Sequence, residues 1–174
     1  MTNSKEPIEN IQWLDAGDLD ANDYNPNAVF SPELKLLERS ILKTGWVQPV
    51  LVNRDMIIID GFHRWMLTKE SKKLNEVYKG KCPVAVLDVD RTEAMILTVR
   101  MNRAKGAHIA TRMSGMIKEL IDELGCDPDE LAKEIGATRK EIDLLHSDGV
   151  FAQKNISNYK YSKAWVPAES THDG

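Results

Sequence analysis

The stretch IIIDGFHRW, from Ile57 to Trp65, limits how this chain can fold. Three consecutive isoleucines favour a buried strand, because β-branched side chains pack well on a pleated surface. Asp60 and Gly61 end that run, and a helical pattern starts at about Phe62. The stretch therefore predicts a strand that turns at a glycine directly into a helix.

The flanking sequence predicts a small α/β domain around this unit. Strands are predicted within residues 11–19, 47–53, 56–60 and 81–89, and helices within residues 31–44, 62–74 and 91–102. The first helix has Ser31 as its N-cap and Pro32 in its first turn, and Gly45 ends it. Its apolar face is formed by Leu34, Leu37, Ile41 and Leu42.

Beyond about Ala107 the pattern is helical only. A helix closed by Gly125 is predicted from apolar residues at helical spacing, namely Met113, Met116, Ile117, Leu120, Ile121 and Leu124. Two short helices follow, within residues 128–136 and 139–147. We therefore expect an α/β domain at residues 8–107, a helical domain at 108–147 and a partly docked tail at 148–174.

The composition narrows the classes of partner. The 174 residues carry a net charge of −4, which argues against a chain that coats nucleic acid but is compatible with a local basic patch. No apolar run has transmembrane length, and the first residues do not resemble a signal peptide. The two cysteines, Cys82 and Cys126, have no metal or redox spacing. We expect a cytoplasmic protein with no membrane partner.

The glycine turn has the chemistry of an anion site. Gly61 lets backbone N–H groups approach a phosphate, and a helix N-terminus adds positive potential. His63 and Arg64 lie in the first turn of that helix, where cations are unfavourable to the helix itself. Such a local conflict is typical of functional sites. The alternative is a solvated His–Arg pair with Asp60 as the helix N-cap.

The longer segment SILKTGWVQPVLVNRDMIIIDGFHRW resembles the N-terminal domain of the ParB/sulfiredoxin superfamily. In that family a helix with S-I leads to G-x-x-Q-P-[IV]-x-V, a hairpin and a G-x-[HR]-R phosphate-binding turn. The matching residues are Ser40, Ile41, Gly45, Gln48, Pro49, Val50, Val52, Gly61, His63 and Arg64. The resemblance runs from Ile11 to about Leu145 and implies an α/β fold with a small mixed sheet and flanking helices, followed by a helix-turn-helix-like unit.

The resemblance also implies a nucleotide, CTP or ATP with Mg²⁺. Gly61, Phe62, His63 and Arg64 would hold the phosphates, and Gln48 would lie near the base or ribose. A further family motif, E-N-x-x-R, corresponds to MNRAK here. Asn102 matches the asparagine and would reach Mg²⁺ through the nucleotide, whereas Met101 replaces the glutamate.

Lys105 replaces the arginine of that motif, and Arg103 lies between. This departure puts efficient nucleotide hydrolysis in doubt. The same segment is also typical of a basic helix C-terminus, where cations favour the helix dipole.

The residues that other activities of the superfamily require can be compared with this sequence. Sulfiredoxin has a nucleophilic cysteine where this chain has Phe62, which argues against that activity. No carboxylate–histidine cluster with two-metal spacing supports a nuclease. Serine kinases with a D-G-x-H-R turn resemble the stretch more closely, and in that alternative Asp60 would be the catalytic base.

The helical part has the spacing of a helix-turn-helix at Ala132, Gly136, Ile142 and Leu145. Arg139 and Lys140 open its second helix, where a recognition helix would meet duplex DNA. However, residues 127–146 contain six acids against three Lys or Arg residues, which disfavours phosphate binding. Packing against a partner or the first domain is the alternative.

The tail carries Tyr159, Tyr161 and Trp165 among lysines, and we expect these aromatics to dock on the domain rather than stack on bases. The whole chain resembles short stand-alone ParB-like proteins of phages and mobile elements, of the immunoglobulin-binding-regulator B type. That resemblance implies a PAPS-reductase-like partner enzyme. We expect a nucleotide-binding accessory or regulatory protein that acts on DNA or on a partner, with a homodimer as one assembly. A DNA-binding regulator with a vestigial nucleotide site is a further alternative.

Overall fold

A computed structural model describes residues 6–24, 31–104 and 110–147. The chain divides into two compact units, Met1–Thr98 and Val99–Gly174, and the boundary falls within helix α4 (Arg91–Ala104). The predicted domain limits at residues 8–107 and 108–147 stay predictions. The aromatic tail predicted above lies outside the described residues, as does Lys105.

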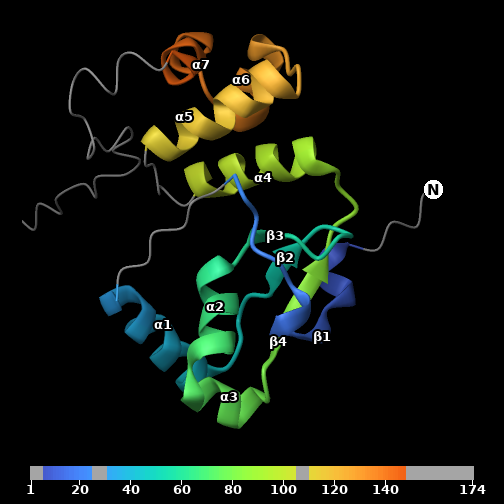
Figure 1. Cartoon of the computed structure of the whole chain (residues 1–174), viewed down its shortest axis with the longest axis vertical. Coiled ribbons are helices and arrows are strands. Elements are labelled where there is room, and N and C mark those ends of the chain that lie inside the picture. Colours follow the sequence, from blue (N-terminus) through green and yellow to red (C-terminus); the bar gives the residue numbers. More distant parts are fainter. Residues whose placement is uncertain (1–5, 25–30, 105–109, 148–174) are drawn as a thin grey trace, which may run out of the picture. The chain divides into compact units, whose positions relative to one another are not determined.

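The first unit is built on a mixed four-stranded sheet, as expected (Figure 1). Its strands are β1 (Gln12–Asp15), β2 (Val50–Val52), β3 (Ile58–Asp60) and β4 (Lys81–Val86), in the order β1-β4-β2-β3. β4 pairs antiparallel with β1 and parallel with β2, whereas β2 and β3 form an antiparallel hairpin. Short 3₁₀ helices, Pro7–Asn10 and Ala16–Asp18, flank β1.

Helices α1 (Ser31–Thr44), α2 (Phe62–Glu70) and α3 (Lys72–Tyr78) gather to one side of the sheet (Figure 1). The main core lies between the sheet and α2, and its buried members are Ala16, Leu19, Val50, Val52, Ile58, Trp65, Cys82 and Val84. Ile41 of α1 packs with Leu67 and Leu74 in a second cluster. Leu42, which was predicted on the apolar face of α1, is 37% exposed.

The prediction of one continuous helix over residues 62–74 was wrong. The helix ends at Glu70, and Ser71 adopts an extended conformation between α2 and α3. The Ser71 hydroxyl accepts a hydrogen bond from the Leu74 amide and donates one, 2.5 Å long, to Glu38 of α1. The break therefore caps α3 and joins it to α1, which are tertiary requirements that a helical pattern does not reveal.

Replacing Ser71 tests this junction. Ser71→Ala removes the cap of α3 and the hydrogen bond to Glu38, so we expect a loss of about 1–3 kcal/mol in the free energy of unfolding. Urea denaturation measures it. Ser40→Ala, on the exposed side of α1, is the matched control and should change stability by less than about 0.5 kcal/mol. Equal effects of the two substitutions would contradict the role given to Ser71.

The second unit contains α5 (Ala110–Lys118), a π-helical turn (Glu119–Glu123), α6 (Pro128–Ile135) and α7 (Arg139–His146). Its predicted apolar residues are buried at Met113, Met116, Ile117 and Leu120. Leu124, the residue that follows the π turn, is 36% exposed instead.

The two short helices form where they were predicted. Asp127 caps α6, Thr138 caps α7, and Gly136 between them has φ +67°. Ala132, Ile142 and Leu145 are buried. Among the described residues, no helix is long and apolar enough to cross a bilayer.

Candidate nucleotide-binding site

The glycine turn leaves the start of α2 without a side-chain cap. Gly61 is the N-cap residue with φ +95°, in the left-handed region, and the first turn contains no acid. Asp60 therefore does not cap the helix, so this alternative from the sequence was wrong. A helix start whose N-cap residue has no side chain, and whose potential is positive, is receptive to an anion.

Arg64 folds back across the turn instead of extending from the helix. Its Nη1 donates to Gln48 Oε1 at 2.7 Å, and its Nη2 donates to the Pro49 carbonyl at 3.1 Å. Nη2 also forms an ion pair with Asp60 Oδ2 at 3.3 Å. The structure thus brings together three predicted site residues, Gln48, Asp60 and Arg64, and adds the Pro49 carbonyl.

Sequence reasoning treated Asp60 and Arg64 separately and missed their pairing. Their separation of only four residues across the turn is a local signal that could have found it. The contact to Pro49 carries no such signal, since it joins segments 15 residues apart. One guanidinium proton remains without a partner, because Arg64 Nε is buried and has no hydrogen-bond partner among the described residues.

Gly61 is required by this packing as well as by its backbone angle. A Cβ atom placed on Gly61 would lie 2.9 Å from Arg64 Nη2 and 3.2 Å from Val50 Cα. The guanidinium therefore lies directly over the glycine. The turn and the arginine form one unit, in which neither keeps its place without the other.

A comparison of Gly45 with Gly61 separates the effect of the backbone angle from the effect of packing against Arg64. Gly45 and Gly61 have similar backbone angles, φ +86° and +95°, but a Cβ at Gly45 would touch nothing within 4 Å. We expect Gly45→Ala to destabilise the protein by about 1–2 kcal/mol through the backbone alone. Gly61→Ala should lower the free energy of unfolding by at least about 1 kcal/mol more than Gly45→Ala does, because Arg64 and β2 must shift. Equal losses in thermal or urea denaturation would show that Arg64 does not lie over Gly61.

The neighbouring side chains hold α2 in place. The Trp65 indole donates to the Ala16 carbonyl at 2.7 Å, within the buried core. Phe62 is half-buried and its ring centroid lies 5.4 Å from that of Trp65 and 5.9 Å from that of His63. Phe62 and His63 thus lie at the helix start, as predicted, and Phe62 contributes mainly to packing.

The remaining predicted nucleotide residues lie in the second unit. Arg103, near the end of α4, donates to Glu141 Oε1 at 2.7 Å and to the Gly136 carbonyl at 3.0 Å. It is therefore engaged in holding α4 to the α6–α7 turn. Asn102 is partly exposed beside it. No group of three or more His, Cys, Asp or Glu side chains able to hold a metal occurs in the described ranges.

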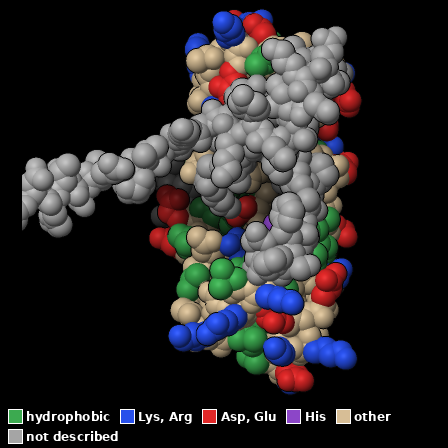
Figure 2. Space-filling model, turned by 90° about the vertical axis from the view of Figure 1, so that its left-hand side faces the viewer, with side chains coloured by type: hydrophobic (Ala, Val, Ile, Leu, Met, Phe, Trp, Pro, Cys, Tyr) green, Lys and Arg blue, Asp and Glu red, His purple; other side chains and the backbone are tan. Residues whose placement is uncertain are grey.

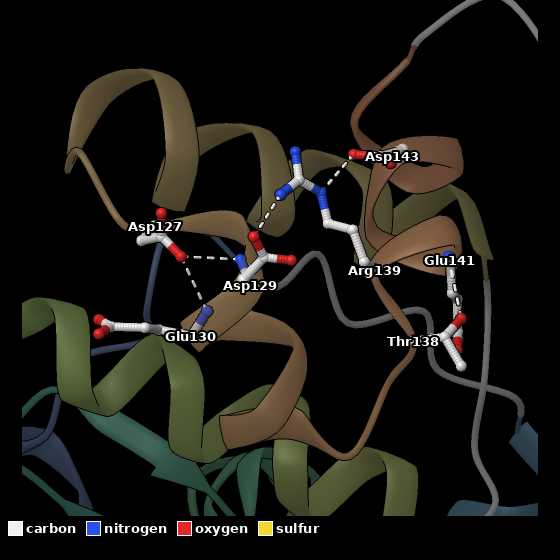
Figure 3. A network of polar contacts seen from close by, with 7 residues as sticks. All are labelled: Asp127, Asp129, Glu130, Thr138, Arg139, Glu141 and Asp143. Carbon is white, nitrogen blue, oxygen red and sulfur yellow. Dashed lines mark hydrogen bonds and ion pairs between the residues drawn. The ribbon is translucent and has the colours of Figure 1, made fainter.

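The predicted DNA-binding residues open α7. Arg139 lies between two acids, with Nε 2.8 Å from Asp143 and Nη1 2.9 Å from Asp129 (Figure 3). Hydrogen bonds to Asp143 and Asp129 raise the pKa of Arg139 above its already high ordinary value. Lys140 is exposed. Arg139 thus links α6 to α7 and would have to leave both acids to contact a base.

Cys82 does not have the properties of a reactive thiol. Cys82 is buried within β4, and burial, with a smaller contribution from the charge of Asp15, raises the pKa of its thiol from 9.0 to about 11. A buried thiol of high pKa is a poor nucleophile, since the thiolate is the reactive form. Cys82 is therefore a core residue.

The raised pKa of Cys82 makes the stability of the fold depend on pH in the alkaline range. The folded state holds the thiol proton more tightly than the unfolded state, so the contribution of Cys82 is complete below pH 9 and is lost as pH rises towards 11. We expect the wild type to lose about 2 kcal/mol more than Cys82→Ala between these values, measured by urea denaturation at each pH. Parallel stability curves for the two proteins would contradict the assignment.

The mixed sheet and the glycine turn that leads into an uncapped helix define a small α/β domain with an anion-receptive helix start. The chain belongs to the ParB N-terminal domain family, whose model matches residues 2–103. It is 39% identical to the protein YbdM of Escherichia coli (strain K12) over 167 residues, which cover 93% of this chain and 78% of that protein.

More distant relatives are chromosome-partitioning proteins. The probable chromosome-partitioning protein ParB of Rickettsia bellii (strain RML369-C) is 25% identical over 143 residues, 82% of this chain and 48% of that protein. The chain thus spans about half the length of this relative.

Solved structures share the fold. The pNOB8-like ParB N-domain aligns with a TM-score of 0.57 and 16% identity, over 87% of this chain and 70% of that one. The C-terminally truncated ParB of Caulobacter crescentus, complexed to the centromeric parS site, aligns with a TM-score of 0.51 and 18% identity, over 77% and 69% of the two chains. These likenesses confirm the predicted fold class.

Proposed function

We propose that the chain is a nucleotide-binding, ParB-like accessory or regulatory protein that holds the phosphates of CTP or ATP at the start of α2. One observation carries the proposal: α2 begins at a left-handed glycine with no capping side chain and no acid in its first turn. Anions bind at such helix starts through backbone N–H groups and the helix dipole. His63 and Arg64 add positive charge at the same end.

The role of Arg64 in this proposal follows from its contacts. Its guanidinium is held by Gln48, Pro49 and Asp60, so it fixes the shape of the turn and supplies charge from a set position. The buried Nε–H, which has no partner among the described residues, is a donor that a phosphate oxygen would satisfy. A preorganised donor of this kind favours binding, because less conformational freedom is lost.

Magnesium would act with the nucleotide, and phosphate oxygens would supply most of its ligands. The Asn102 ligand that the family motif implies stays a prediction. Bound Mg²⁺ would neutralise phosphate charge. The replacement of the family's motif residues at Met101 and Lys105 supports weak hydrolysis or none.

Titration calorimetry with CTP, ATP and ADP, with and without Mg²⁺, tests the proposal. Wild type should bind one of the triphosphates, and Arg64→Ala should bind it at least about tenfold more weakly, the loss of roughly 1.4 kcal/mol or more expected for a charged hydrogen-bond donor. Arg54→Ala removes an equal charge from an exposed pair with Asp88 in the same unit and should leave affinity unchanged. The proposal fails if no nucleotide binds wild type, or if both variants behave alike.

Two alternative functions are considered, one at the Gly61 turn and one at the α6–α7 helices. In the kinase alternative Asp60 is the base, although its pairing with Arg64 supports a structural role. Product formation from ADP or ATP plus serine, abolished in Asp60→Asn, would favour that alternative. In the other, the α6–α7 helices act as a helix-turn-helix on duplex DNA, and the structurally similar Caulobacter ParB is complexed to the centromeric parS site.

The finer assignments rest on the resemblance described above. They are the stand-alone phage or mobile-element subtype, a PAPS-reductase-like partner, a homodimer and a cytoplasmic location. Family membership supports a ParB-like role and is compatible with each of them.

A further inference from the structure

An open groove between α1 and α3 is lined mainly by cations. Its volume is about 630 Å³, and its lining residues are Lys35, Glu38, Arg39, Leu42, Lys43 and Lys73. Four of these six side chains are positive and one is negative, in a chain whose net charge is −4. Figure 2, which faces the side of the molecule on which α1 lies in Figure 1, shows several Lys and Arg side chains on the lower part of that side, with Asp, Glu and hydrophobic side chains among them.

The cations form a row. Lys35, Arg39 and Lys43 follow one another at intervals of four residues, so they lie along one side of α1. With a rise of 1.5 Å per residue, the row extends about 12 Å along the helix. Lys73 stands opposite, on α3.

The one acid in the groove is already engaged. Glu38 Oε1 accepts the 2.5 Å hydrogen bond from Ser71, and Oε2 lies 4.0 Å from Lys73 Nζ. Within the described part of the chain, Lys35, Arg39 and Lys43 form no ion pair. In this respect they differ from Arg64, Arg103 and Arg139, each of which is bound to a carboxylate.

The frame that carries the row is fixed. Ser71 joins α1 to the α2–α3 break, and the Tyr78 hydroxyl lies 3.5 Å from the Ile41 carbonyl. Ile41, Leu67 and Leu74 pack beneath the groove as one buried cluster. The spacing of the two cationic sides is thus set by the core and does not depend on the lysines themselves.

We propose that this groove binds the phosphate backbone of duplex DNA without regard to sequence. A DNA strand carries one phosphate per about 3.4 Å of helix axis, so a row of about 12 Å faces roughly three phosphates. None of the six lining residues within the described chain is aromatic, which favours backbone contact over the base stacking that single strands need. The concave shape fits a ridge of phosphates better than a flat membrane surface.

The binding of a fluorescent 30-base-pair duplex of mixed sequence to the full chain, followed by anisotropy without nucleotide, tests the proposal. Wild type should bind at low salt, with a slope of log affinity against log salt of about −3 to −4. The triple variant Lys35→Gln, Arg39→Gln, Lys43→Gln should bind at least about tenfold more weakly, and its slope should be smaller by roughly three. A second duplex of unrelated sequence should give the same values.

A matched control separates this surface from others. The triple variant Arg54→Gln, Lys79→Gln, Lys81→Gln removes the same charge outside the groove and should keep the wild-type slope.

Four results would overturn the proposal: no duplex binding by wild type at 50 mM salt, an unchanged slope for the groove variant, an equal loss in the control, or binding to anionic phospholipid vesicles but not to DNA. The groove is distinct from the Gly61 turn, so nucleotide titration of the groove variant should match wild type whether or not the DNA result holds.

Discussion

The packing of the Arg64 guanidinium over Gly61 is the contact on which the glycine turn of the first unit depends. Its guanidinium joins Gln48 and Pro49, which lead into β2, to Asp60 at the end of β3. It thereby ties the hairpin to the start of α2, while Trp65 anchors the next position of the helix to Ala16. Gly61, and not Asp60, is the N-cap residue of α2, and the first turn carries no acid, so the helix start keeps its positive potential. The geometry that orders the turn is thus the same geometry that makes it receptive to phosphate.

The described cations of this chain have two kinds of surroundings. Arg64, Arg103 and Arg139 each bind a carboxylate inside their own unit, where the planar guanidinium can join several acceptors at once. The row on α1, which includes two lysines, points into an open groove instead. An acidic chain can therefore present a local cationic surface, because net charge describes the whole molecule and binding responds to the nearby field.

Much of the fold could be predicted because its signals are local. The strands, the start and end of α1, and the caps of α6 and α7 follow from alternation, Pro and Gly positions and capping residues. The break at Ser71 and the π turn before Leu124 could not be predicted, since both serve contacts between distant segments or change the register within a helix. The exposure of Leu42 was missed for the same reason, because the elements that pack on a helix determine which of its apolar residues are buried.

The sequence by itself determined that Gly61 ends a strand and starts a helix, and that His63 and Arg64 stand there, because turn chemistry is encoded within a few residues. The motif also established the family to which the chain belongs. Only the tertiary structure decided what Arg64 binds, that Arg139 is held by two acids, and that Lys73 faces the row on α1. Those outcomes depend on which segments fold against one another, and long-range packing sets them rather than local pattern.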